Sequence, residues 1–66
     1  MLLTVNGTQT ELAEGTTVAT LVAQRADQDR RIAVAVNSEV VPRSAWATTL
    51  LTSQDSVEML TAVAGG

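Results

Sequence analysis

The sequence of 66 residues contains no cysteine, histidine, lysine, tyrosine or phenylalanine. Without cysteine, neither a disulfide nor a thiolate-bound metal can support the fold. Without histidine, the commonest general base and the commonest transition-metal ligand are missing, and without lysine Schiff-base chemistry is excluded. We therefore expect no catalytic residues, no metal site and no cofactor bound by the chain itself.

Positive charge is also scarce, since four arginines stand against seven acids and the net charge is -3. An acidic chain without a basic stripe or aromatic platforms is a poor nucleic-acid binder, and a basic protein surface is its natural complement. The longest purely apolar stretch, Ile32 to Val36, is far too short to span a bilayer, and the start does not resemble a signal peptide. We expect a cytoplasmic protein whose partners are proteins, not nucleic acid or membrane.

Apolar periodicity and turn signals predict one domain with the element order β-β-α-β-β-β. Asn6-Gly7 is the strongest two-residue hairpin signal, because both positions tolerate positive φ. Thr16 or Thr17 can cap a helix whose apolar face begins at Val18. The expected strands are 2–5, 8–12, 32–36, 39–41 and 57–62, with a loop at 27–31, turns at 14–15, 37–38 and 53–56, and a helical turn at 44–48.

One helix over a mostly antiparallel sheet makes a two-layer α+β fold. The element order favours the β-grasp arrangement, a mixed sheet of four or five strands with the first and last strands side by side at its centre. Residues 1–62 would form this domain and residues 63–66 a flexible tail. Because side chains alternate between the faces of a strand, the predicted core is Leu3, Val5, Leu12, Val18, Leu21, Val22, Ile32, Val34, Val36, Leu50, Val57 and Met59, with Trp46 as a further plug.

The same alternation places Ala33, Ala35 and Leu60 on the opposite face of the sheet, with Glu58 beside Leu60. Two interpretations are open. Scattered surface apolar residues are ordinary and need no explanation. Alternatively, these residues form a docking patch for a partner enzyme close to the tail.

The most unusual feature is the terminal pair Gly65-Gly66, which chance produces in roughly one chain in 200. A plain interpretation is a tolerant chain end. In the functional interpretation, the slender tail from Ala64 threads a narrow channel of a partner, and no side chain obstructs the carboxylate of Gly66. A free carboxylate is a poor electrophile, so a partner would have to adenylate it with ATP before sulfur could replace AMP and leave a thiocarboxylate.

No other group of residues in the sequence is a stronger candidate for the functional site. Pairs such as Glu11 and Glu14, or Asp27 and Asp29, are more typical of solvated charges than of acid/base couples. The only Gly-Gly pair ends the sequence, so no phosphate-binding loop is spelled out. A self-contained enzyme is therefore improbable, and the chain is better explained as a carrier on which other enzymes act.

Several segments resemble the bacterial thiamine-biosynthesis sulfur carrier family, ThiS. The most discriminating is Val-Pro-Arg-Ser-x-Trp-Ala-Thr-Thr at 41–49; the opening at 5–7, the run at 34–37 and the ending at 57–66 are also similar. The resemblance covers nearly the whole chain, although a terminal Gly-Gly is shared by ubiquitin-like proteins generally. The sequence departs from the family at Ser38, where glycine is usual, at Ala45, where an acid is common, and at Asp55-Ser56, where a glycine-containing turn is common.

The resemblance implies a β-grasp fold and a carrier function in thiazole formation. Gly66 would be adenylated by a ubiquitin-activating-like adenylyltransferase, ThiF, and then converted to a thiocarboxylate. The sulfur would come from a donor such as a cysteine desulfurase and would pass to thiazole synthase, ThiG. Gly65 would be the slender residue before the modified one, and ATP would be bound by the activating partner rather than by the carrier.

Three alternatives remain at this point. The small subunit of molybdopterin synthase uses the same tail chemistry, a protein-conjugating modifier shares the tail, and a non-catalytic β-grasp binding module would tolerate extra residues after Gly66. Two residues of the discriminating run also have plain explanations. We expect Trp46 to be a core plug rather than a partner anchor, and Arg43 to be a solvated or locally paired charge.

Overall fold

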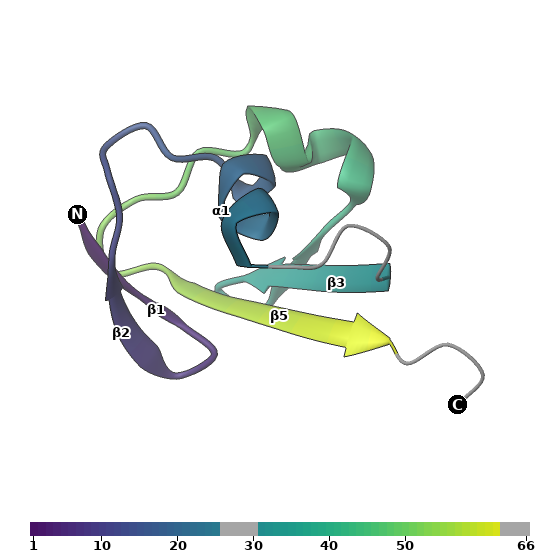
Figure 1. The fold of residues 1–66 in the computed structure, drawn as a ribbon, viewed down its shortest axis with the longest axis horizontal. Coiled ribbons are helices and arrows are strands. Elements are labelled where there is room, and N and C mark those ends of the chain that lie inside the picture. The colour runs from purple at the N-terminus through teal and green to yellow at the C-terminus, as the bar shows by residue number, and fades with distance from the viewer. Residues whose placement is uncertain (26–30, 63–66) are drawn as a thin grey trace.

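The computed structural model describes residues 1–25 and 31–62. It contains, in chain order, β1 (Leu2–Val5), β2 (Thr8–Glu11), α1 (Val18–Arg25), β3 (Arg31–Val36), β4 (Glu39–Val41), the 3-10 helix η1 (Arg43–Thr48) and β5 (Ser56–Ala62). The strands form one sheet in the order β2-β1-β5-β3-β4, and α1 and η1 lie on the same side of it (Figure 1). The predicted two-layer β-grasp fold is confirmed.

Strand β5 is the central element of the sheet. It pairs in parallel with β1 through Thr4 and Val5, and antiparallel with β3 from Val57 to Ala62. The predicted neighbourhood of the first and last strands is therefore confirmed. The two outer pairs, β1 with β2 and β3 with β4, are both antiparallel.

Both hairpins close through two-residue turns in the left-handed region. Asn6 and Gly7 have φ of 52° and 79°, and Asn37 and Ser38 have φ of 52° and 69°. Positive φ at both central positions matches the right-handed twist of the strands, which is why Asn-Gly is favoured there. Ser38 adopts a conformation that glycine adopts more readily, so the departure from the family at this position is accommodated with local backbone strain.

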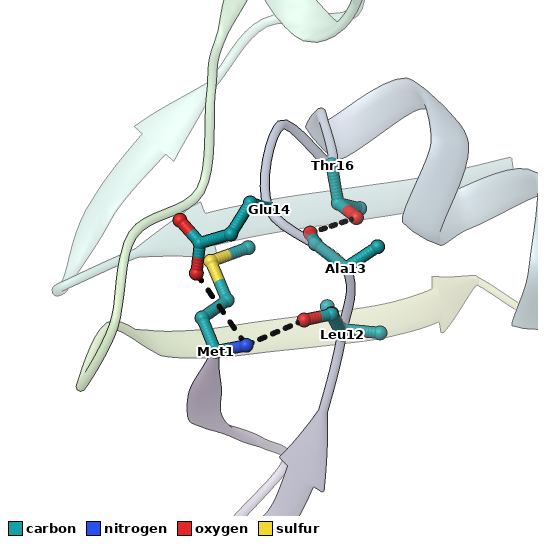
Figure 2. A network of polar contacts seen from close by, with 5 residues as sticks. All are labelled: Met1, Leu12, Ala13, Glu14 and Thr16. Atoms are coloured by element: carbon teal, nitrogen blue, oxygen red, sulfur yellow. Dashed lines mark hydrogen bonds and ion pairs between the residues drawn. The ribbon is translucent and has the colours of Figure 1, made fainter.

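The loop between β2 and α1 is held by short backbone contacts. The amino group of Met1 donates to the carbonyl of Leu12 at 2.7 Å and lies 3.5 Å from the carboxylate of Glu14, while Thr16 Oγ1 donates to the carbonyl of Ala13 at 2.7 Å (Figure 2). The amide of Leu12 also donates to the carbonyl of Met1 at 2.9 Å. Leu12 therefore continues the pairing with the first strand, although β2 itself ends one residue earlier than predicted.

Helix α1 begins where the threonine pair predicts. Thr17 Oγ1 accepts a hydrogen bond from the amide of Thr20 at 3.2 Å, which satisfies one of the orphan donors of the first turn. Val18 and Leu21 are fully buried against the sheet, while Val22 packs at the edge of the core. The short helix is thus stabilised by its apolar face rather than by its length.

The core is close to the predicted one. Its buried apolar members are Leu3, Val5, Val18, Leu21, Val34, Trp46, Leu51 and Val57. One prediction is wrong: Leu50 is 61% exposed, whereas Leu51 is 3% exposed. Leu50 forms an isolated antiparallel bridge with Thr17, so the segment is extended there and neighbouring side chains point to opposite sides.

Three further element boundaries differ from expectation. The helical turn η1 begins at Arg43, one residue before the expected start. Arg31 was assigned to the loop at 27–31, but it begins β3 opposite Ala62. Ser56 was assigned to a turn, but it begins β5 opposite Thr4. Both residues are polar, and pairing with a neighbouring strand overrides their weak strand propensity. The remainder of that loop, residues 27–30, and the tail, residues 63–66, lie outside the described residues.

Candidate functional site

The face of the sheet turned away from α1, here called the outer face, carries an apolar patch. Leu60 and Val40 are 68% and 72% exposed, Ala33 is exposed, and Ala35 is half-buried. The strand register brings these four residues together, because Ala33 lies opposite Leu60 and Ala35 opposite Val40. The predicted outward orientation of Leu60 is confirmed, because Leu60 is exposed while its neighbour Met59 packs against the core.

Val40 is a member of this patch that the sequence reasoning missed. A signal was present, because Val41 next to it packs against the core and adjacent residues of a strand point to opposite faces. The strand is only three residues long, so its alternation is too short to assign faces by itself. The pairing of Ala35 with Val40 decides the assignment.

Strand β5 connects the apolar patch to the glycine pair. Leu60 lies two residues before Ala62, the last residue of the strand, and the register with β3 extends to that end. Glu58 is exposed on the same strand, two residues before Leu60. The predicted modified residue Gly66 and the predicted recognition residues Ala64 and Gly65 lie outside the described residues, so the structure places only the strand that leads to them.

Trp46 supports the fold rather than the patch. Its ring is buried, at 8% exposure, and its Nε1 donates to the carbonyl of Val41 at 2.9 Å. The guanidinium carbon of Arg43 lies 5.1 Å from the ring centroid, within the range of a cation–π contact. The prediction of a core plug is confirmed, and Arg43 is a locally paired charge. The discriminating run at 41–49 therefore belongs largely to the scaffold.

The start of β5 is fixed by a polar network around Asp55. Its carboxylate accepts hydrogen bonds from Asn37 Nδ2 at 3.0 Å and from the amide of Thr52 at 2.8 Å. Partial burial acts to raise the pKa of Asp55, but the hydrogen bonds from Thr52 and Asn37 outweigh it and hold the pKa below its ordinary value. The ionised carboxylate thus ties the β3–β4 turn to the segment that enters β5.

This network predicts an acid-sensitive contribution to stability. Because the folded-state pKa of Asp55 is depressed, its contribution is present above the unfolded pKa of about 3.9 and is lost as pH falls through the folded value. Asp55→Ala should lower the free energy of unfolding by about 1 kcal/mol near neutral pH. The difference from wild type, measured by urea titration at several pH values, should shrink below about pH 4. A difference that stays constant into acid would contradict this assignment.

Two further kinds of site can be checked in the part of the chain that the structure describes. Among residues 1–25 and 31–62, no group of three His, Cys, Asp or Glu side chains is placed to hold a metal ion. No helix within those same residues is long and apolar enough to cross a membrane. We take as the candidate site the apolar patch of the outer face and the strand β5, which precedes the terminal glycines in the chain.

Comparisons with known proteins identify the family of the chain. The ThiS family model matches residues 3–66. Thiazole synthase from Paramagnetospirillum magneticum is 30% identical over 66 residues, a match that covers 100% of this chain but 20% of that relative. This chain thus spans about a fifth of the length of the curated relative it matches.

Two solved structures are also similar. The crystal structure of the thiamine biosynthesis protein ThiS from Geobacter metallireducens has a TM-score of 0.83 and 36% identity, with 100% of both chains covered. The NMR solution structure of a thiamine biosynthesis protein from the same organism has a TM-score of 0.78 and 36% identity, with 100% of this chain and 88% of that chain covered. The family match spans nearly the whole sequence and includes the terminal glycines, and on this ground the chain belongs to the ThiS family.

Proposed function

We propose that this chain is a sulfur carrier in thiamine biosynthesis and that Gly66 bears the sulfur. The observation that carries the proposal is the ThiS family match, which runs through the domain to Gly66 itself. The structure supports it in a second way, because the described residues form a small packed scaffold similar to that of a solved ThiS structure. In this proposal the reactive group is the carboxylate of Gly66.

The proposed chemistry has three steps, all catalysed by partners. A carboxylate oxygen of Gly66 attacks the α-phosphorus of ATP, and pyrophosphate leaves, so that the tail becomes an acyl adenylate. The terminal sulfur of a persulfide then attacks the carbonyl carbon, and AMP leaves with its bonding electrons. A thiol cleaves the resulting S–S bond, which leaves the thiocarboxylate on Gly66 and forms a disulfide with the donor. This chain contributes the electrophilic carbonyl carbon of Gly66 and the surface by which partners recognise the carrier.

The partners follow from these steps. An adenylyltransferase related to ubiquitin-activating enzymes, ThiF, would bind ATP and activate the tail, and a cysteine desulfurase or similar donor would supply the persulfide. Thiazole synthase, ThiG, would receive the sulfur. The similarity of the whole chain to part of a protein named thiazole synthase supports this last pairing. Since adenylation consumes ATP, we place the reactions in the cytoplasm.

We propose the apolar patch of Ala33, Ala35, Val40 and Leu60 as the surface that partners recognise. Its two large members are more than half exposed, and β5 leads directly from Leu60 toward the tail. A partner that covers the patch can therefore reach the tail at the same time. Glu58 on the same strand favours a partner with a basic group at the rim, in keeping with the net charge of -3.

Leu60→Arg should weaken binding of the activating enzyme by at least about tenfold while leaving the fold intact. The side chain is 68% exposed, so the arginine can extend into solvent, and the stability change should stay within about 0.5 kcal/mol. Titration calorimetry measures the binding. Leu50→Arg is the matched control, because Leu50 is 61% exposed beside Thr17 and away from the outer face. Equal binding by both variants would remove the patch from the proposal.

A growth test addresses the function as a whole. A bacterium that lacks its own thiamine sulfur carrier requires added thiazole, and expression of this chain should remove that requirement. The same chain without Gly66 should fail, although it carries an identical described domain. Growth restored equally by both forms would contradict a function that depends on the tail.

A further inference from the structure

On the side that faces β1, strand β5 is held first by backbone hydrogen bonds and then by a side chain. The amides of Thr4 and Asn6 donate to the carbonyls of Asp55 and Val57 at 3.0 and 2.8 Å, as in an ordinary parallel ladder. At Asn6 the chain turns away, with φ of 52°. The backbone of β1 can therefore not reach Met59, the next residue of β5 with polar groups directed to this side.

The side chain of Asn6 supplies the missing rung. Its Oδ1 accepts a hydrogen bond from the amide of Met59 at 2.8 Å, and its Nδ2 donates to the carbonyl of the same residue at 3.3 Å. One side-chain amide thus pairs with both backbone groups of Met59, as a peptide group of a neighbouring strand would. Beyond Met59, among the described residues, pairing of β5 continues on the β3 side through Leu60 to Ala62.

The contact between Asn6 and Met59 lies next to the apolar patch. Met59 directly precedes Leu60, the exposed member of the patch on β5, and it lies three residues before the end of the strand. A partner that recognises the patch needs β5 to be fixed at Leu60, because ordering a loose strand on binding lowers affinity. We infer that Asn6 is a positioning residue that fixes the part of β5 carrying Leu60 for recognition by the activating partner; this inference rests on the proposed function.

Asn37 provides a matched comparison within the same chain. It also has φ of 52° in a two-residue turn, and its Oδ1 accepts from the amide of Ser56 at 2.9 Å. It therefore holds the beginning of β5, whereas Asn6 holds the strand near its functional end. Each asparagine makes two side-chain hydrogen bonds, one of them to a β5 amide. Both contacts stabilise the fold, so a merely structural effect should appear in both variants.

The test compares Asn6→Gly with Asn37→Gly. Glycine keeps the positive φ of both turns, so each variant loses only its side-chain contacts. Amide hydrogen exchange, followed by NMR, should accelerate at Met59 in the first variant and at Ser56 in the second. The Michaelis constant for the carrier in ATP–pyrophosphate exchange by the activating enzyme should rise about fivefold in Asn6→Gly and less than about twofold in Asn37→Gly.

The possible results distinguish failure of the inference about Asn6 from failure of the proposed function. A rise in the Michaelis constant confined to Asn6→Gly, with faster exchange at Met59, supports the inference. Equal Michaelis constants for the two variants, or unchanged exchange at Met59, overturn it. If the wild-type chain itself supports no pyrophosphate exchange with an enzyme that activates its own carrier, the proposed function fails and the inference falls with it.

Discussion

Removal of Gly66 is expected to abolish adenylation of the chain, with a loss of more than about 100-fold in the rate of ATP–pyrophosphate exchange. One residue of extended chain spans about 3.5 Å, so the new carboxylate would end that far short of the α-phosphorus. A misplacement of about 1 Å in a reacting group already costs on the order of 100-fold. Binding energy gained at the outer face cannot compensate, because the reacting atoms no longer meet.

Addition of one alanine after Gly66 is the matched variant for this experiment. It keeps every residue of the native chain but moves the carboxylate outward by the same distance. A carrier should lose activity in both variants, whereas a non-catalytic binding module should tolerate the extension. Urea titration of each variant checks that the domain is intact. Retained exchange activity in both would contradict a reaction at the terminal carboxylate.

Leu21→Ala is expected to bring the domain close to its folding limit. Leu21 has no exposed surface and lies between α1 and the sheet, where the deleted methyl groups leave a cavity. Such changes cost about 2–5 kcal/mol. A domain of this size rarely has more than about 3–5 kcal/mol in total. Urea unfolding, followed through the fluorescence of the single buried tryptophan, Trp46, should therefore show a large shift of the midpoint.

Leu50→Ala serves as the control for the same chemical change. Leu50 is 61% exposed, so the substitution should alter the free energy of unfolding by about 0.5 kcal/mol or less. This comparison also tests the reassignment of the core from Leu50 to Leu51. A destabilisation of similar size in both variants would place Leu50 back in the core.

Much of the fold could be predicted from local patterns. The Asn6-Gly7 pair, the threonine at the start of α1 and the alternation in 32–36 and 57–62 each have a physical signal that acts within a few residues. The structure confirms the hairpin, the helix cap and the faces of both strands. These features were accessible because turn geometry and side-chain alternation are local properties of the chain.

The misplaced and missed residues depend on contacts between distant segments. The bridge between Thr17 and Leu50 decides which of Leu50 and Leu51 enters the core. These two bridged residues lie 33 positions apart in the sequence. The contact of Asn6 with Met59 joins residues 53 positions apart, and an asparagine before glycine signals only a turn. The patch was incomplete for the same reason, since Val40 joins it through pairing with Ala35.

The features of the candidate site also differ in whether local sequence patterns predict them. The outward orientation of Leu60 followed from alternation, and the structure confirms it. The assignment of Gly66 came from the ending of the sequence and from the resemblance to the ThiS family, and it remains a prediction. The structure adds how β5 is held on the way to that tail, which no local pattern in the sequence encodes.

The most direct test of the account is the intact mass of the protein after incubation with the activating enzyme, ATP and a persulfide sulfur donor. We predict a mass gain equal to the replacement of one oxygen by one sulfur, and fragmentation should locate it at Gly66. An unchanged mass, obtained with an enzyme preparation that loads its own carrier, would contradict the account. A gain located at any other residue would contradict it equally.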